Sequence, residues 1–91
     1  MVWAIIVDDK AFKELQKLDK PIAARIINFI ENRLAVADNP RSLGAALQGS
    51  ELGDFWKYRV GDYRIIASID DVHVTIAIVK LVIEKKCIVK F

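Results

Sequence analysis

Three cationic side chains of this 91-residue chain are placed where they could act together on one anion. Lys57 and Arg59 lie two positions apart in an alternating stretch, and Arg64 follows a Gly-Asp pair. Guanidinium groups match phosphate oxygens with forked hydrogen bonds, and an ammonium group adds a point charge. The spacing therefore indicates either a phosphate-binding surface or a solvated cationic sheet face whose repulsion is screened by salt.

The composition narrows the kind of protein that carries these residues. Apolar residues make up 54% and charged residues 29%, which is typical of a globular chain, and the net charge is +2. Cys87 is the only cysteine and His73 the only histidine, so neither an intramolecular disulfide, a cysteine zinc site nor a multi-histidine metal cage is possible. No segment resembles a signal peptide or reaches membrane-spanning length. We expect one cytoplasmic domain over residues 1–91, without a cofactor or metal.

Two helical segments are predicted in the first half of the chain. Phe12, Leu15 and Leu18 recur at spacings of three within residues 10–18, which indicates a helix with one apolar stripe. A second helical period runs from Ile22 to the break at residues 38–40 (DNP). The short connection between the two segments predicts an antiparallel helical hairpin.

Strand patterns precede and follow these helices. The predicted strands are Trp3–Val7, Asp54–Val60, Tyr63–Ile69 and Val72–Leu81, with a loop over residues 41–53. Two-residue turns are predicted at Gly61-Asp62 and Asp70-Asp71. The order β-α-α-β-β-β predicts an α+β fold, in which an antiparallel sheet carries the helical hairpin on one face.

The first predicted turn decides which side chains share a sheet face. It pairs Arg59 with Arg64 and places Lys57 on the same outward face, because side chains alternate along a strand. The second turn would pair Ser68 with His73, roughly 13 Å along the strand from Arg64 at ~3.3 Å per residue, so His73 is not expected to act with it. The opposite face is predicted to pack against the helices, through Trp56, Tyr58, Val60, Tyr63, Ile65, Ala67, Ile69, Val72, Val74, Ile76 and Ile78.

Three segments carry a resemblance to a known family. Residues 15–21 (LQKLDKP), 38–41 (DNPR) and above all 56–65 (WKYRVGDYRI) resemble the RelE toxins of the RelE/ParE superfamily, and the match covers about residues 1–80. The resemblance implies a bacterial type II toxin that enters the ribosomal A site and cleaves mRNA. It also implies a RelB-like antitoxin that neutralises the toxin by wrapping over it.

The resemblance assigns roles to the three cations. Cleavage by attack of a ribose 2′-OH on the adjacent phosphate needs a proton acceptor and cations that stabilise the charged transition state. Lys57 and Arg59 match positions that supply the base or this stabilisation, and Arg64 matches a phosphate-holding position. Further RNA contacts are predicted on both sides of this cluster, from Lys13, Lys17, Arg41, Lys85 and Lys86.

The end of the chain departs from the family pattern. RelE toxins normally close their last strand with Gly-His-Arg-x-x-Val-Tyr, whereas residues 81–91 read LVIEKKCIVKF and no arginine or tyrosine follows Arg64. We therefore predict that this chain cleaves mRNA poorly or not at all. The apolar residues of this atypical tail are also predicted to pack on the sheet edge or to promote self-association.

A lost base could explain the tail. Residues 82–89 (VIEKKCIV) can be encoded as GTC-ATA-GAA-AAG-AAG-TGT-ATC-GTA. If the Leu81 codon ends in G, regrouping from that base gives GGT-CAT-AGA-AAA-GAA-GTG-TAT-CGT, which encodes Gly-His-Arg-Lys-Glu-Val-Tyr-Arg. This sequence contains the family motif. The hypothesis would be refuted by a genomic source whose intact reading frame ends in the present tail.

Two other functions stay open at this point. A ParE-like gyrase inhibitor would act through protein contact and would need no catalytic residues, which agrees with the missing terminal arginine and tyrosine. A non-catalytic module that only binds an antitoxin or RNA would need none either. The Lys57, Arg59 and Arg64 cluster favours the ribonuclease.

Overall fold

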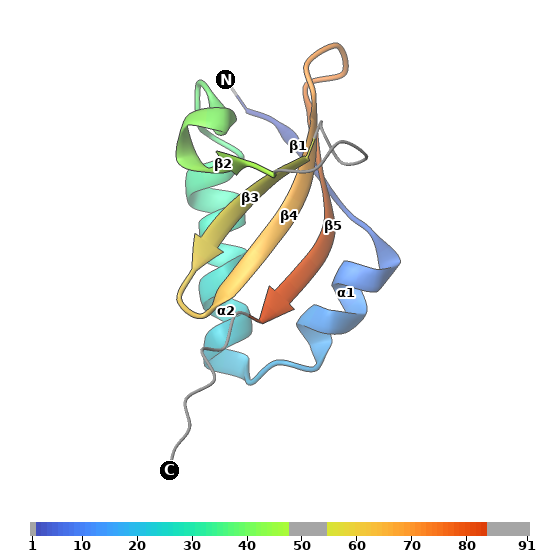
Figure 1. Cartoon of the computed structure of the whole chain (residues 1–91), viewed down its shortest axis with the longest axis vertical. Helices are drawn as coiled ribbons and strands as arrows, with labels where there is room; N and C mark the ends of the chain where they lie inside the picture. The colour runs from blue at the N-terminus through green and yellow to red at the C-terminus, as the bar shows by residue number, and fades with distance from the viewer. Residues whose placement is uncertain (1, 48–54, 84–91) are drawn as a thin grey trace.

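The chain folds as two helices beside a curved sheet of five strands (Figure 1). The computed structural model describes residues 2–47 and 55–83. The elements are β1 (Ala4–Val7), α1 (Asp9–Gln16), α2 (Lys20–Phe29), the π-helical turn η1 (Ile30–Leu34), the 3-10 turn η2 (Pro40–Leu43), β2 (Ala45–Ala46), β3 (Phe55–Val60), β4 (Tyr63–Asp70) and β5 (Thr75–Ile83). The predicted α+β class is confirmed. No helix in these two described ranges is long and apolar enough to cross a membrane.

The sheet is mixed, with strand order β1-β5-β4-β3-β2. Strands β3, β4 and β5 pair antiparallel, as predicted, but β1 joins the edge of β5 in parallel. The expected loop over residues 41–53 is wrong at its start, because η2 and β2 form there and β2 pairs with Lys57 and Trp56 of β3. The parallel pairing of β1 and the short strand β2 both depend on contacts across the sheet, which a local sequence pattern does not reveal.

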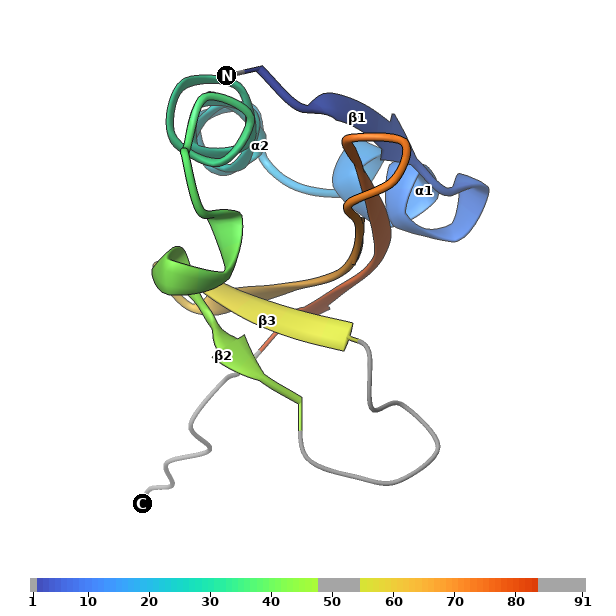
Figure 2. The ribbon, with the colours of Figure 1, turned by 90° about the horizontal axis from the view of Figure 1, so that it is seen from above.

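Both helices pack on one face of the sheet. Ala11 of α1 and Ile26 of α2 are fully buried, α1 contacts β5 and α2 contacts β3. Seen from above, the sheet curves around α2 (Figure 2). Phe12, part of the predicted apolar stripe, is 49% exposed, whereas the neighbouring Ala11 is fully buried. The core consists of Trp3, Ala11, Ile26, Ile30, Leu34, Tyr58, Ile65, Ala67, Ile76, Ile78 and Leu81.

The β3–β4 turn forms as predicted, whereas the β4–β5 turn does not. Gly61 adopts φ = 61° and sets the pairs Arg59 with Arg64 and Val60 with Tyr63. A tight two-residue turn needs such left-handed backbone, which glycine supplies at little steric cost. The Asp70-Asp71 pair has no glycine, and the chain turns instead over residues 71–74, with φ = 48° at Val74.

The longer turn changes the register of β5. Asp70 now pairs with Thr75, and its carboxylate accepts hydrogen bonds from the backbone N–H groups of Val72 and His73. Val72, predicted to lie in the core, is 84% exposed. The predicted Ser68–His73 pair is wrong as well, because Ser68 faces Ala77.

A β-bulge displaces the second half of β5. Ala67 pairs with Ile78 and Ile66 with Lys80, so Val79 has no counterpart on β4. One extra residue reverses the facing of every side chain beyond it. Leu81 therefore packs in the core, and Lys80 is exposed on the outer face.

The η2–β2 segment packs closely on β3. Tyr58 Oη donates a hydrogen bond of 2.9 Å to the Pro40 carbonyl oxygen. A Cβ at Gly44 would lie 2.5 Å from the Lys57 carbonyl oxygen and 2.7 Å from the Tyr58 ring. The absence of a side chain at Gly44 is therefore what allows this approach.

We expect Gly44→Ala to destabilise the fold by about 1–3 kcal/mol, because the added methyl group overlaps the β3 backbone. Urea unfolding followed by circular dichroism measures the change. Ala46→Ser is the matched control, since Ala46 is exposed on the same short strand. Equal unfolding midpoints for the two variants would contradict this account of the packing.

Candidate phosphate-binding site

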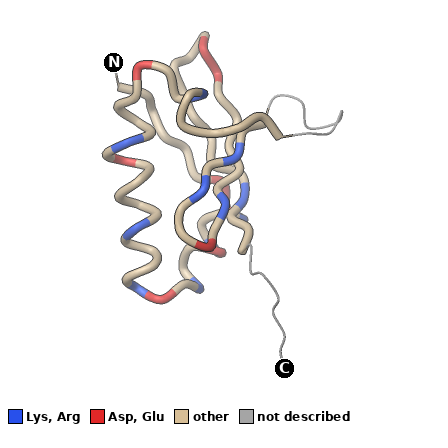
Figure 3. Tube along the Cα trace, turned by 60° about the vertical axis from the view of Figure 1, so that its left-hand side comes forward, with Lys and Arg blue, Asp and Glu red and all other residues tan. Residues whose placement is uncertain are grey.

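Lys57, Arg59 and Arg64 meet at one hollow on the sheet face opposite the helices. Arg59 and Arg64 are direct partners across β3 and β4, and Lys57 precedes Arg59 by two residues. Figure 3 shows Lys and Arg positions gathered on neighbouring strands of the sheet. We call the hollow the cation cavity; its volume is about 270 Å³, and its lining is Leu43, Gly44, Ala45, Lys57, Tyr58, Arg59 and Arg64.

The described residues that line the cation cavity carry charge of one sign. None of them is a carboxylate, and neither Lys57 nor Arg59 forms an ion pair within the described part of the chain. Like charges opposite one another on a sheet are destabilising. An anion in the cavity would relieve that repulsion, and a phosphate group offers enough oxygens for both guanidinium forks.

Tyr58 borders the cavity between Lys57 and Arg59 on β3, and its buried hydroxyl group does not titrate near neutral pH. Its side chain is 1% exposed, and burial raises its pKa to about 12. Its hydroxyl group donates to Pro40, which fixes η2 beside the site. Tyr58 therefore holds η2 in place beside the cavity. Because its hydroxyl group stays protonated, it is not a proton acceptor.

Arg41, predicted to bind RNA, is held by other groups. Its Nη1 and Nη2 atoms donate to Asp71 at 3.1 and 2.8 Å, and its guanidinium lies 5.9 Å from the centre of the Trp56 ring. The Asp71 hydrogen bonds raise the pKa of Arg41, and the same bonds lower the pKa of Asp71. Arg41 thus joins η2 to the β4–β5 turn and does not line the cation cavity.

Of the remaining predicted RNA contacts, the two lysines of the α1 region are not brought to this site. Lys13 and Lys17 are exposed on α1 and its C-cap, and neither lines the cation cavity. Lys85 and Lys86 lie outside the described residues. For all of these the RNA-binding role stays a prediction.

Sequence reasoning missed Lys80. Continued alternation from Ile78 would direct Lys80 toward the helices, but the bulge at Val79 brings it to the outer face, opposite Ile66 and in line with Lys57. A lysine at a position expected to be buried was the available signal. It could have indicated a change in facing, although not the position of the bulge.

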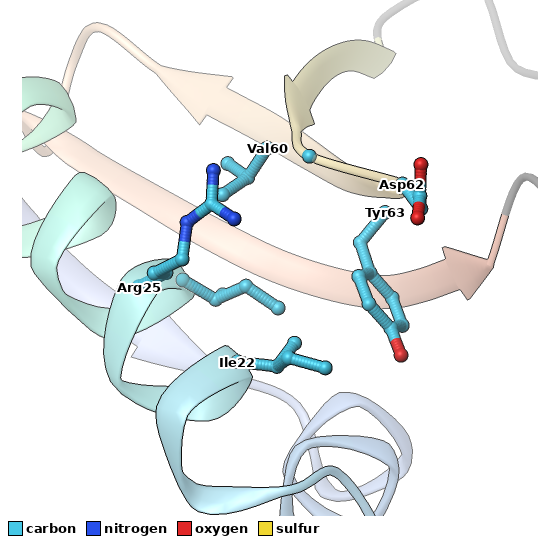
Figure 4. Close-up of a pocket in the computed structure, with 7 residues that line it drawn as sticks. Ile22, Arg25, Val60, Asp62 and Tyr63 are labelled. Atoms are coloured by element: carbon cyan, nitrogen blue, oxygen red, sulfur yellow. The ribbon is translucent and has the colours of Figure 1, made fainter.

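Another hollow, of about 250 Å³, lies between α2 and the β3–β4 turn (Figure 4). Arg25 and Asp62 line it together with Ile22, Val60 and Tyr63. Nη1 of Arg25 is 3.5 Å from where a Cβ of Gly61 would lie. With one cation and one carboxylate, this hollow is less suited to a phosphate than the cation cavity is.

Comparisons with known proteins agree on one kind of relative. Residues 5–84 match the family model described as ParE toxin of type II toxin-antitoxin system, parDE. Toxin RelE of Mycobacterium tuberculosis is 32% identical over 79 residues, covering 87% of this chain and 78% of that protein.

Solved structures give the same result. The M. tuberculosis toxin-antitoxin complex RelBE2 contains a chain with a TM-score of 0.82 and 28% identity, covering 91% of this chain and 92% of that one. The archaeal RelE-RelB complex from Pyrococcus horikoshii contains a chain with a TM-score of 0.75 and 28% identity, covering 96% and 100%.

The Arg41–Asp71 pair predicts an acid-dependent loss of stability. Because Arg41 lowers the folded-state pKa of Asp71, the pair stabilises the fold above about pH 4 and loses this effect as pH falls through the folded pKa. The urea midpoint of Asp71→Asn should lie below that of the unmodified chain at pH 7, and the two should converge in acid. Asp62→Asn at the other turn is the control. A difference that stays constant with pH would contradict the ionic origin.

Proposed function

Because this chain belongs to the ParE toxin family of type II toxin–antitoxin systems, within the RelE/ParE superfamily, we propose that its cation cavity is the site of a RelE-like, ribosome-dependent mRNA endoribonuclease. The observation that carries this proposal is the meeting of Lys57, Arg59 and Arg64 in one open hollow, whose described lining residues include no carboxylate. A surface that acts only through protein contact has no need for that arrangement.

The geometry suits attack of a ribose 2′-OH on the next phosphate. Negative charge then grows on the phosphate oxygens, and stabilising it is a large part of catalysis. Arg59 and Arg64 approach from two adjacent strands, so they can contact the phosphate from two sides. In this proposal Arg64 holds the phosphate and Arg59, whose guanidinium keeps its proton, stabilises charge. Lys57 accepts the 2′-OH proton in its neutral form or stabilises charge as an ammonium.

The atypical tail is expected to impair this chemistry. RelE-like toxins supply a further arginine and a tyrosine from the end of the chain, and neither residue type occurs after Arg64 here. Lys85 and Lys86 supply charge, but an ammonium group does not reproduce a forked arginine contact. In the proposal this chain therefore binds its target and cleaves it poorly or not at all.

The partners follow from the family. The two similar structures are toxins in complex with RelB-type antitoxins, which supports a cognate antitoxin for this chain. The ribosome and mRNA in the cytoplasm would be the target. Of the apolar tail residues, Leu81 packs in the core, whereas Ile83 is 51% exposed. Self-association through the tail stays a prediction.

Gyrase inhibition is the second candidate, because the matching family model is named for ParE. A non-catalytic antitoxin- or RNA-binding module is the third, and it would describe a chain whose tail has removed activity. DNA supercoiling and translation assays run side by side separate the first two. Inhibited supercoiling with intact ribosome-bound mRNA would replace the ribonuclease proposal by the gyrase one.

Removing single cations from the cavity should slow cleavage. In a version whose tail is restored to GHRKEVYR at residues 82–89, we expect Arg64→Ala and Lys57→Ala to lower the cleavage rate of ribosome-bound mRNA by about 10²–10³-fold, since each removes stabilisation of the phosphate charge. Arg33→Ala, an exposed arginine on η1, is the control and should cleave normally. Unchanged cleavage by Arg64→Ala would overturn the proposed site.

Restoring the tail should itself increase activity. If the missing groups supply acid–base help and one phosphate contact, the restored version should cleave at least about 10²-fold faster than the present chain. Primer extension on A-site mRNA measures both rates. Equal and fast cleavage by the two versions would show that the tail does not limit the reaction.

A further inference from the structure

A second hollow on the outer sheet face adjoins the cation cavity. Its volume is about 280 Å³, and it is lined by Lys10, Phe55, Ile66, Val79 and Lys80. We call it the Phe55 cavity. Lys57 of the cation cavity is the direct cross-strand partner of Ile66, so the two hollows meet at this pair.

Elements far apart in the sequence build the Phe55 cavity. Phe55 begins β3 and lies diagonally from Ile66, while the β5 bulge turns Lys80 outward, opposite Ile66. Strand β1 ends opposite Ile78. The first turn of α1 then brings Lys10 beside the part of β5 that follows Ile78 and has no β1 partner. The described residues of this lining are apolar except for two ammonium groups, and none of them is a carboxylate.

This combination fits one class of ligand best. Proteins that bind single-stranded nucleic acid combine aromatic rings, on which bases stack, with lysines and arginines that follow the phosphates. Neither Lys10 nor Lys80 forms an ion pair with any residue in the described ranges. Their charge is therefore available for a phosphate, and Phe55 and Ile66 offer apolar surface for a base.

The two hollows lie one step apart along the strands. Arg64 and Ile66 face the same side two residues apart on β4, roughly 7 Å. One nucleotide of an extended RNA strand can span that distance. Lys57 lies between the hollows and can contact the connecting backbone.

We propose that the Phe55 cavity is a nucleotide subsite that holds a base and phosphate next to the cleaved bond, with the base against Phe55 and the phosphate at Lys80 and Lys10. The proposal rests on the proposed function, because that function places the cleaved phosphate in the cation cavity. It adds a continuous RNA path across the outer face and three residues that set affinity for the neighbouring nucleotide.

Binding of RNA to the full chain tests the subsite without requiring cleavage. The probe is a short fluorescein-labelled oligouridylate, followed by fluorescence anisotropy over a range of salt concentrations. Phe55→Leu keeps an apolar side chain but removes the ring, and we expect about tenfold weaker binding with an unchanged salt dependence. Phe55→Trp should bind as well as the unmodified chain or better.

The lysine variants should give a different signature. Lys80→Ala and Lys10→Ala each remove one phosphate contact, so the slope of log K against log salt should become shallower by about 0.7. Phe12→Leu and Arg33→Ala are matched controls from outside both hollows, with an exposed ring and an exposed charge, and both should leave affinity and slope unchanged. Circular dichroism confirms that each variant is folded.

The outcomes separate this inference from the function on which it rests. Weaker binding by Lys57→Ala and Arg64→Ala, with no effect at Phe55, Lys10 or Lys80, would overturn the subsite and keep the proposed function. Weaker binding by the Phe55 and Lys80 variants alone would show an RNA site at the Phe55 cavity, but it would overturn the placement of this site beside a phosphate held in the cation cavity. No effect in any variant would overturn both. Binding of an oligoglutamate with the same Phe55 dependence would overturn the assignment to RNA.

Discussion

The alternation of β3 and β4 across the Gly61 turn is the constraint on which the rest of the structure depends. Tyr58 and Ile65 are buried against the helices, with exposures of 1% and 0%. Because side chains alternate, this burial forces Arg59 and Arg64 onto the opposite face, and the tight turn makes them direct partners. The free energy gained from hydrophobic burial on one face thus outweighs the repulsion between Arg59 and Arg64 on the other.

The walls around this charge pair come from a segment with little regular structure. The η2–β2 segment approaches β3 closely because Gly44 has no side chain, and the Tyr58–Pro40 hydrogen bond fixes its position. The Arg41–Asp71 pair then joins η2 to the β4–β5 turn. These contacts convert an exposed sheet surface into a cavity with a defined shape, which a phosphate-binding site requires.

The outer face as a whole is organised for an extended ligand. The cation cavity concentrates charge from β3 and β4, and the Phe55 cavity adds an apolar lining with two lysines from α1 and β5. Family membership makes this chain a type II toxin, and the proposed ribonuclease activity explains why the described lining residues of both cavities include cations but no carboxylate. In this scheme the atypical tail affects the rate of cleavage, whereas RNA binding depends on the strands that line the two cavities.

The sequence by itself determined the α+β class, the β3–β4 pairing and the outward facing of Lys57, Arg59 and Arg64. These features follow from local alternation and from a glycine at a tight turn, which are short-range effects. Only the folded structure decided the rest: the parallel docking of β1, the wider β4–β5 turn, and the bulge that turned Lys80 outward. The wider turn follows from local hydrogen bonds of Asp70 that the two-residue turn pattern does not reveal, whereas the docking of β1 and the position of the bulge depend on pairing between segments distant in sequence. The same holds for Arg41, whose partners Asp71 and Trp56 are brought to it only by the folded sheet.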